Sequence, residues 1–250
     1  IDYCNSKNIK FLSTGFDIES INLLSELNIP LFKIPSGEIT NLPLLQHIGS
    51  LNKPVILSSG MSYMHEIKEA KNILLGSGLN IGDLTVLHCN TEYPSPFKDV
   101  NLNAMLSIKA ELNVSIGYSD HTPGIEVAIA AVAMGATVIE KHFTLNKNMS
   151  GPDHSASLDS DQLIAMVKSI RNIEKSFGSN IKKPSPSEEK NILIARKSIV
   201  AKTRIKPGDL FNENNVTAKR PGNGISPIYW DSVIGQKSKK SYAVDELIEL

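Results

Sequence analysis

The chain has 250 residues, with 26 basic and 26 acidic side chains and a formal net charge of zero at pH 7. This balance gives no reason to expect nucleic acid, an acidic membrane surface or a polyanion as a partner. Two distant cysteines, Cys4 and Cys89, argue against a disulfide scaffold and favour the reducing cytoplasm, and no apolar stretch is long enough to span a membrane.

Six short apolar runs in the first part of the chain are each typical of a buried β-strand. They are IKFLST (9–14), LFKI (31–34), PVILSS (54–59), LTVLHC (84–89), VSIGYS (114–119) and ATVIEKH (136–142). Segments with helical spacing lie between them, at 17–27, 41–51, 64–75, 103–112 and 124–134. Strands that alternate with helices at this spacing predict βαβ units and a parallel sheet.

The second part of the chain differs from the first in composition and in predicted secondary structure. A long amphipathic helix is predicted over 162–177, followed by a segment rich in Pro, Ser and Lys that is typical of a linker. Short strands with turns follow from about residue 197. We therefore predict an α/β domain over 1–178, a linker over 179–196 and a small, largely β domain over 197–250. An open sheet is complete with six strands, whereas a barrel closes at eight.

Two of the predicted strands end in a histidine, His121 in SDHT and His142 in EKHF, with Asp120 and Glu140 beside them. In parallel α/β folds the chemistry lies at the carboxyl ends of the strands. Two imidazoles suit a transition metal and leave positions open for substrate and water. The alternative is that both histidines are structural, and His88 is a third strand-end candidate.

Two further strand ends combine glycine with hydroxyl and cationic side chains, in KIPSGE (33–38) and SSGM (58–61). Such groups bind phosphate, because glycine lets backbone N–H groups approach an anion and Ser and Lys supply donors. Ser-Gly is also ordinary turn chemistry. By composition alone, GPDHSAS (151–157) is typical of a capped loop and KRPGNG (219–224) of a surface hairpin.

Seven stretches, taken in order, closely resemble the bacterial sialic acid synthases: KIPSGEITN, PVILSSGM, LHCNTEYPSP, GYSDHT, VIEKHFTL, GPDHSASL and KRPGNGISP. The resemblance covers essentially the whole chain. It implies a TIM-type (β/α)8 barrel followed by a small, mostly β antifreeze-like (SAF) domain. Family members begin with two further strands and a substrate-binding carboxylate. We therefore expect this chain to be a fragment that lacks the first two barrel strands.

The resemblance also implies roles for individual residues. The family's metal, Mn²⁺ by preference with Mg²⁺ or Co²⁺ as alternatives, is held by histidines that match His121 and His142. The other positions match groups that bind phosphoenolpyruvate or lie near the sugar and metal: Lys33, Ser36, Glu38, Ser58, Asn90, Tyr93, Ser119, Glu140 and Asp153. Among these, Lys33, Glu140 and Asp153 are the expected catalytic residues.

The KRPGNG motif gains a role from the same resemblance. Arg220 matches an arginine that binds the N-acyl group of the sugar. In the family, the antifreeze-like domain of the partner subunit places it there, in a homodimer with swapped domains. This interpretation replaces the surface hairpin.

The implied reaction condenses phosphoenolpyruvate with an N-acylated amino-hexose, giving a nine-carbon sialic-acid-type 2-keto acid and phosphate. A Lewis-acidic metal polarises the sugar aldehyde, and water adds to the former enol carbon. The base for that water is either Glu140 or a hydroxide on the metal. The sugar is N-acetylmannosamine or a 6-deoxy-diacetamido analogue, since residues 140–158 look nearer to the neuraminate and legionaminate enzymes than to the pseudaminate ones.

Three alternatives remain open. One is a pseudaminate synthase, and another is a different phosphoenolpyruvate-dependent aldol synthase that makes an octulosonate or heptulosonate phosphate. The presence of KRPGNG argues against the latter. The third is a non-enzymatic carbohydrate-binding module, which the clustered His, Lys and Ser residues at the strand ends argue against.

Overall fold

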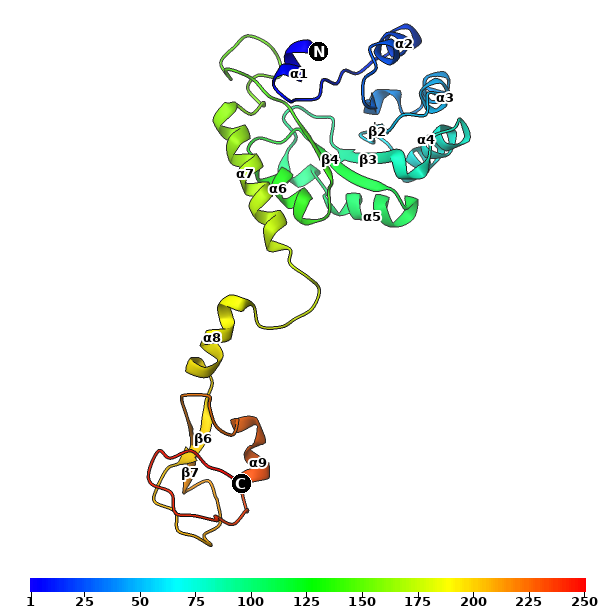
Figure 1. Ribbon diagram of the computed structural model, residues 1–250. Coiled ribbons are helices and arrows are strands. Elements are labelled where there is room, and N and C mark those ends of the chain that lie inside the picture. Colours follow the sequence, from blue (N-terminus) through cyan, green and yellow to red (C-terminus); the bar gives the residue numbers. More distant parts are fainter. The chain divides into compact units, whose positions relative to one another are not determined.

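A computed structural model describes all 250 residues (Figure 1). The chain divides into two compact units, Ile1–Gly178 and Ser179–Leu250. Each unit has a hydrophobic core of its own. No helix combines the length and the apolar character needed to cross a membrane.

The first unit is built on a five-stranded parallel sheet in the order β1-β2-β3-β4-β5. Its strands are β1 (Phe32–Ile34), β2 (Val55–Ser58), β3 (Leu84–Cys89), β4 (Ser115–Asp120) and β5 (Val138–Lys141). Each strand pairs with the next strand along the chain, so every crossover advances by one position. This is the order of a partial (β/α) barrel, and it confirms the predicted fold class.

Helices connect these strands and form an arc around them in Figure 1. They are α1 (Asp2–Ser6), α2 (Ile18–Glu26), α3 (Leu42–Ser50), α4 (Met64–Gly76), α5 (Asn103–Leu112), α6 (Glu126–Ala133) and α7 (Ser160–Ser176), with 3₁₀ turns η1 (Ser36–Glu38), η2 (Ile81–Asp83) and η3 (Phe97–Asp99). Local chemistry fixes their starts. Asp17 accepts a hydrogen bond from the Ser20 backbone N–H, and Asp159 forms a capping box with Gln162. Helices α2 to α7 therefore begin close to where the sequence predicts, whereas α1 was not predicted.

The strand predicted over 9–14 is absent, so that prediction is wrong. The backbone N–H of Ile9 bonds back to the Cys4 carbonyl and closes the turn after α1, whereas residues 10–14 make no backbone–backbone hydrogen bond. Only Phe11 of this segment packs against the core, and Ile9 is 63% exposed. An apolar run becomes a strand only when a neighbour completes its ladder, and this run has none.

The register of the sheet separates the site from the core. Paired residues share a face and side chains alternate along each strand. One face, called here the site face, carries the side chains of Lys33, Ser58, Cys89, Ser119 and Glu140. The opposite face packs apolar side chains against the helices, among them Ile34, Leu57, Val86, Ile116 and Tyr118.

The second unit is small and largely β. It contains α8 (Pro186–Ala195), an antiparallel pair β6 (Ser198–Ala201) and β7 (Val216–Lys219), η4 (Pro227–Tyr229) and α9 (Trp230–Val233). Helix α8 falls inside the segment expected to be a linker. Its start has strong local signals, because Pro186 is the first helical residue and Ser185 forms a capping box with Glu188.

Gly117 of β4 allows the sheet to pack tightly beneath the site. A Cβ there would overlap the Leu87 side chain and the Val138 carbonyl oxygen. We expect Gly117→Ala to lower the free energy of unfolding by about 1–3 kcal/mol, as overpacked cores do. Urea unfolding measures this loss. Gly82→Ala is the matched control, because no atom lies within 4 Å of its added Cβ. Equal stability of the two variants would contradict the packing argument.

Candidate active site

A pocket of about 240 Å³ lies at the carboxyl ends of the strands, on the site face. Its lining includes seven of the residues expected from the sequence: Lys33, Ser36, Ser58, Tyr93, Ser119, His121 and Glu140. A larger hollow of about 610 Å³ lies between α6 and α7. None of the predicted site residues lines that hollow, so the strand-end pocket is the candidate site.

An ion pair crosses the pocket from the first strand to the last. Lys33 Nζ of β1 lies 3.1 Å from Glu140 Oε1 and 2.9 Å from Oε2 of the same β5 carboxylate. Ser119 of β4 donates its hydroxyl proton to Glu140 Oε1 at 2.7 Å. The Lys33 side chain is 14% exposed and that of Glu140 is 43% exposed. The pair is thus sheltered at its cationic end and accessible at its anionic end.

These contacts decide the charge of Glu140. Burial alone raises the pKa of this carboxyl, but the Lys33 ammonium and the hydrogen bonds from Lys33 and Ser119 together hold the pKa below its ordinary value. Glu140 is therefore a carboxylate at neutral pH. It can accept hydrogen bonds or a proton, and it compensates the charge of Lys33.

Three aromatic rings gather beside this pair. The Tyr93 ring centroid lies 4.1 Å from that of His121 and 5.3 Å from that of His142, and the two imidazoles are 5.5 Å apart. Burial, with the charges of Glu140 and Asp153, raises the pKa of the Tyr93 phenol. Tyr93 is therefore a neutral hydrogen-bond donor at this wall of the pocket.

The tautomer of His121 follows from its hydrogen bond. Its Nδ1 lies 2.5 Å from the Asn90 carbonyl oxygen, which can only accept, so Nδ1 carries the proton. Nε2 is then unprotonated and lies 3.4 Å from Ser119 Oγ. Burial and the neighbouring His142 lower the pKa of His121. A neutral imidazole with a free Nε2 is the form that binds a metal ion.

On the other side of the pocket, hydroxyl, thiol and backbone groups surround a small space. The Gly60 backbone N–H donates to Ser36 Oγ at 2.9 Å, and Cys89 Sγ lies 3.3 Å from the same oxygen. Ser58 is 3% exposed, and its Oγ has no hydrogen-bond partner. Buried hydroxyls are nearly always paired, so Ser58 Oγ is available for a bound ligand.

Several predicted residues have other partners. His88 lies on the core side of β3, where Nε2 contacts the Val100 carbonyl oxygen at 2.9 Å, so it is not part of the histidine pair. Asp120 also faces the core side and pairs with Lys141, not with a metal site. Glu38 accepts a hydrogen bond from Asn41 at 2.6 Å.

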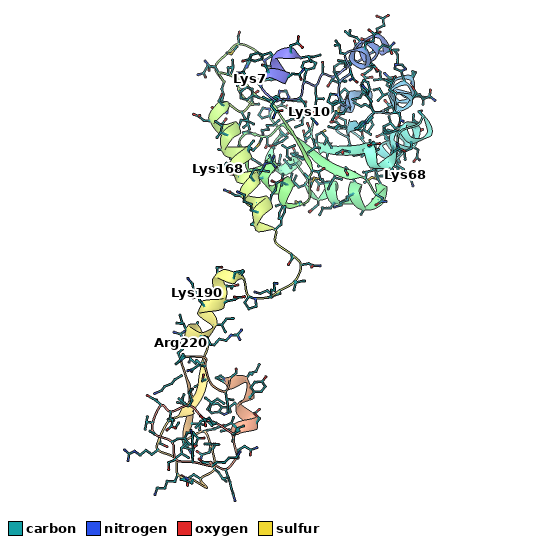
Figure 2. All side chains as sticks on the ribbon, viewed as in Figure 1. Lys7, Lys10, Lys68, Lys168, Lys190 and Arg220 are labelled. Carbon is teal, nitrogen blue, oxygen red and sulfur yellow. The ribbon has the colours of Figure 1, made fainter.

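Three more expected residues occupy loops. The Asn90 side chain accepts from the Glu92 N–H within its own loop. Asp153 Oδ2 lies 3.9 Å from His142 Nδ1. Arg220, labelled in Figure 2, belongs to the second unit and follows β7 directly, where its Nε donates to the Ala195 carbonyl oxygen. Its role over the site stays a prediction.

The two imidazoles also allow a test of the expected metal. The structure contains no group of three or more His, Cys, Asp or Glu side chains that could hold an ion. The His121 and His142 ring centroids nonetheless lie 5.5 Å apart, and His121 lines the strand-end pocket. Two imidazole donors with room for substrate and water fit a divalent transition ion.

Comparisons with known proteins show the family of the chain. Residues 1–182 match the NeuB family and residues 196–249 match the SAF domain. The chain is 56% identical to an N,N'-diacetyllegionaminic acid synthase of Campylobacter jejuni over 96% of this chain and 72% of that protein. The chain belongs to the NeuB family. The expected resemblance and the enzyme class, a phosphoenolpyruvate-condensing transferase, are thereby confirmed.

Two other relatives extend the comparison. A second N,N'-diacetyllegionaminic acid synthase, from Legionella pneumophila, is 42% identical over 94% of this chain and 67% of that protein. The crystal structure of the spore coat polysaccharide biosynthesis protein SpsE from Bacillus subtilis has 33% identity and a TM-score of 0.68. The match covers 99% of this chain and 74% of SpsE, so this chain resembles SpsE in both sequence and fold along nearly its whole length.

Sequence reasoning gave Cys89 no role, yet its thiol lines the pocket beside Ser36. The alternation of side chains along β3 could have shown that Cys89 faces the site. Cys89 shares a face with Leu87 and is paired with Ser119, which lies on the site face. Gly60 was also missed as an individual residue. A Cβ there would lie 2.8 Å from Ser36 Oγ and 3.0 Å from Cys89 Sγ, so the turn needs glycine.

The charge state of Glu140 gives a pH-dependent prediction. A carboxyl whose pKa is lowered on folding stabilises the fold above its ordinary value of 4.5, and this stabilisation is lost as the pH falls through the folded pKa. Glu140→Gln should therefore be less stable than the unsubstituted chain at neutral pH, and the difference should shrink in acid. Urea unfolding across this range measures it, with exposed Glu19→Gln as control. A difference that grows in acid would contradict the assignment.

Proposed function

We propose that this chain condenses phosphoenolpyruvate with a 6-deoxy-diacetamido-hexose, giving a legionaminate-type nine-carbon 2-keto acid and phosphate. The observation that carries the proposal is the unpartnered, buried hydroxyl of Ser58 in the same pocket as Lys33 and His121, whose ring lies 5.5 Å from that of His142. The choice of sugar is supported by the two similar relatives, both of which are named as diacetyllegionaminic acid synthases.

The anionic groups of phosphoenolpyruvate suit the Ser36, Ser58 and Lys33 side of the pocket. Ser58 Oγ has a free proton to donate. Ser36 Oγ already accepts from the Gly60 N–H, so its own proton can turn toward a ligand. Lys33 supplies the charge, and a bound phosphate would share it with Glu140. These groups orient the enol for attack, which is catalysis by positioning.

The opposite wall is suited to the sugar. His121 through Nε2, and His142, would hold a divalent ion, Mn²⁺ by preference, which when bound polarises the aldehyde of the open-chain sugar as a Lewis acid. The Asn90 carbonyl oxygen keeps the His121 proton on Nδ1. Tyr93, a neutral phenol that packs on both imidazoles, can donate a hydrogen bond to the sugar.

The bond changes then follow. C3 of phosphoenolpyruvate forms a bond to the aldehyde carbon as the C2–C3 and C=O π bonds break, so C2 gains cationic character and the aldehyde oxygen becomes an alkoxide that takes up a proton to give a hydroxyl. Water adds to C2 and loses a proton, which Glu140 is placed and charged to accept. The tetrahedral carbon expels phosphate by C–O cleavage, which leaves the 2-keto acid. Asp153, 3.9 Å from His142, is assigned to the sugar side.

We place the reaction in the cytoplasm, where the buried Cys89 thiol in the pocket stays reduced. The working form in the proposal is a homodimer, with Arg220 of one subunit reaching the N-acyl group at the other's site. Arg220 is exposed and its guanidinium holds only the Ala195 carbonyl through Nε, so its terminal donors are free for a ligand.

Phosphate release from phosphoenolpyruvate tests the proposal. We expect release that depends on the diacetamido sugar, exceeds that with N-acetylmannosamine, and stops with EDTA. His142→Ala should abolish it, because one imidazole cannot hold the ion. Release without any sugar, or undiminished in EDTA, would contradict the proposed reaction.

Ser58→Ala tests the side of the pocket that is proposed to bind the anion. It removes a hydroxyl with no partner in the fold, so stability to urea should be unchanged. The KM for phosphoenolpyruvate should rise about tenfold, as for one lost hydrogen bond to a charged ligand. An unchanged KM would show that Ser58 does not contact the substrate.

Shared sites in a swapped dimer predict complementation. Arg220→Ala and His142→Ala should each be nearly inactive alone. Equal co-expression should restore about a quarter of the activity, because half of the dimers are mixed and each contains one intact site. No recovery from demonstrably mixed dimers would show that Arg220 acts within its own subunit or not at all.

A further inference from the structure

A buried ion pair lies behind the two site histidines, on the core side of the sheet. Lys141 Nζ of β5 is 2.8 Å from Asp120 Oδ2 of β4, and their side chains are 5% and 0% exposed. The reaction proposed above uses neither residue. A buried ion pair is costly to desolvate and adds little net stability over well-packed apolar residues. A role in fixing geometry accounts for it better than a role in stability.

The pair is the centre of a closed hydrogen-bond network. Asp120 Oδ1 accepts from the Thr122 backbone N–H at 2.9 Å and from the Thr122 hydroxyl at 2.7 Å. Lys141 Nζ also donates to the Thr122 carbonyl oxygen at 2.5 Å. Asp120 and Thr122 are the chain neighbours of His121. The backbone on both sides of this histidine is therefore tied to β5.

The pair also marks the end of the β4–β5 ladder. Asp120 and Lys141 are the last partners in its register, and His121 and His142 are the next residues along each strand. Because side chains alternate, a pair locked on the core side directs the following histidines to the site face. A slip of one residue would exchange the faces of Glu140 and Lys141 and turn His142 away from the pocket.

We infer that Asp120 and Lys141 are a positioning pair, which holds His121 and His142 at the mutual distance and orientation that a shared divalent ion requires. Neither side chain faces the pocket, so the pair acts through the backbone of the two histidines. Because its charges cancel, its effect on a cation is geometric and not electrostatic. The inference rests on the proposed metal site.

Binding of Mn²⁺ to the full chain without substrates tests this pair, with the free ion followed by electron paramagnetic resonance. The double variant Asp120→Asn/Lys141→Met removes both charges and leaves no uncompensated ion. We expect its Mn²⁺ affinity to fall about 10- to 100-fold, the usual effect of losing groups that orient metal ligands. The single variant Lys141→Arg keeps the positive charge and a hydrogen-bond donor, and should keep most of the Mn²⁺ affinity of the unsubstituted chain.

Lys71→Met is the matched control. Lys71 is also a partly buried lysine that donates to a backbone carbonyl, that of Leu112, but it is remote from the histidines in sequence and lies on α4. Lys71→Met should leave the Mn²⁺ affinity unchanged, even if it lowers the free energy of unfolding. If the double variant does not unfold cooperatively, Asp120→Asn/Lys141→Gln, which keeps an acceptor for Thr122 and leaves no uncompensated charge, is measured in its place and should also bind Mn²⁺ more weakly.

The outcomes separate the two proposals. Equal Mn²⁺ affinity of a folded Asp120 variant and the unsubstituted chain would overturn the positioning role and leave the metal site intact. An equal loss in Lys71→Met would also overturn it, because general destabilisation would then explain the effect. Absence of Mn²⁺ binding by the unsubstituted chain would overturn the metal site itself, and the positioning role with it.

Discussion

The ion pair between Lys33 and Glu140 joins the first and last strands of the sheet, and the site depends on the curvature that allows it. Four strand spacings separate β1 from β5, about 19 Å on a flat sheet. The two side chains together cannot span that distance. They meet because the sheet is rolled as in a barrel, which brings both edges to one mouth. This contact closes the pocket on one side and brings one cationic and one anionic side chain into it.

Glu140 connects two chemically different walls. On one side lie Lys33 and the hydroxyls of Ser36 and Ser58, suited to an anion, and on the other the imidazoles that follow β4 and β5. The carboxylate compensates Lys33, accepts from Ser119 and faces the space between the walls. Substrates held on the two walls would thus meet beside a group able to take up a proton. This division explains why a single small pocket can serve a condensation of two substrates.

Much of this arrangement follows from the sequence. Apolar runs at βα spacing predicted five of the strands, and their polar tails predicted Lys33, Ser58 and His121 at one mouth. The errors have a common cause. Position at a strand end does not determine the face, so His88 was a plausible ligand until the register put it on the core side. Hydrophobicity likewise cannot show whether the run at 9–14 has a ladder partner.

A crystal structure of the chain with phosphoenolpyruvate and Mn²⁺ tests the central claim most directly. The account predicts an anomalous manganese peak bounded by His121 Nε2 and the His142 ring, with an anionic group of phosphoenolpyruvate on Ser58 Oγ and Lys33. Manganese at His88, or phosphoenolpyruvate in the hollow between α6 and α7, would contradict it.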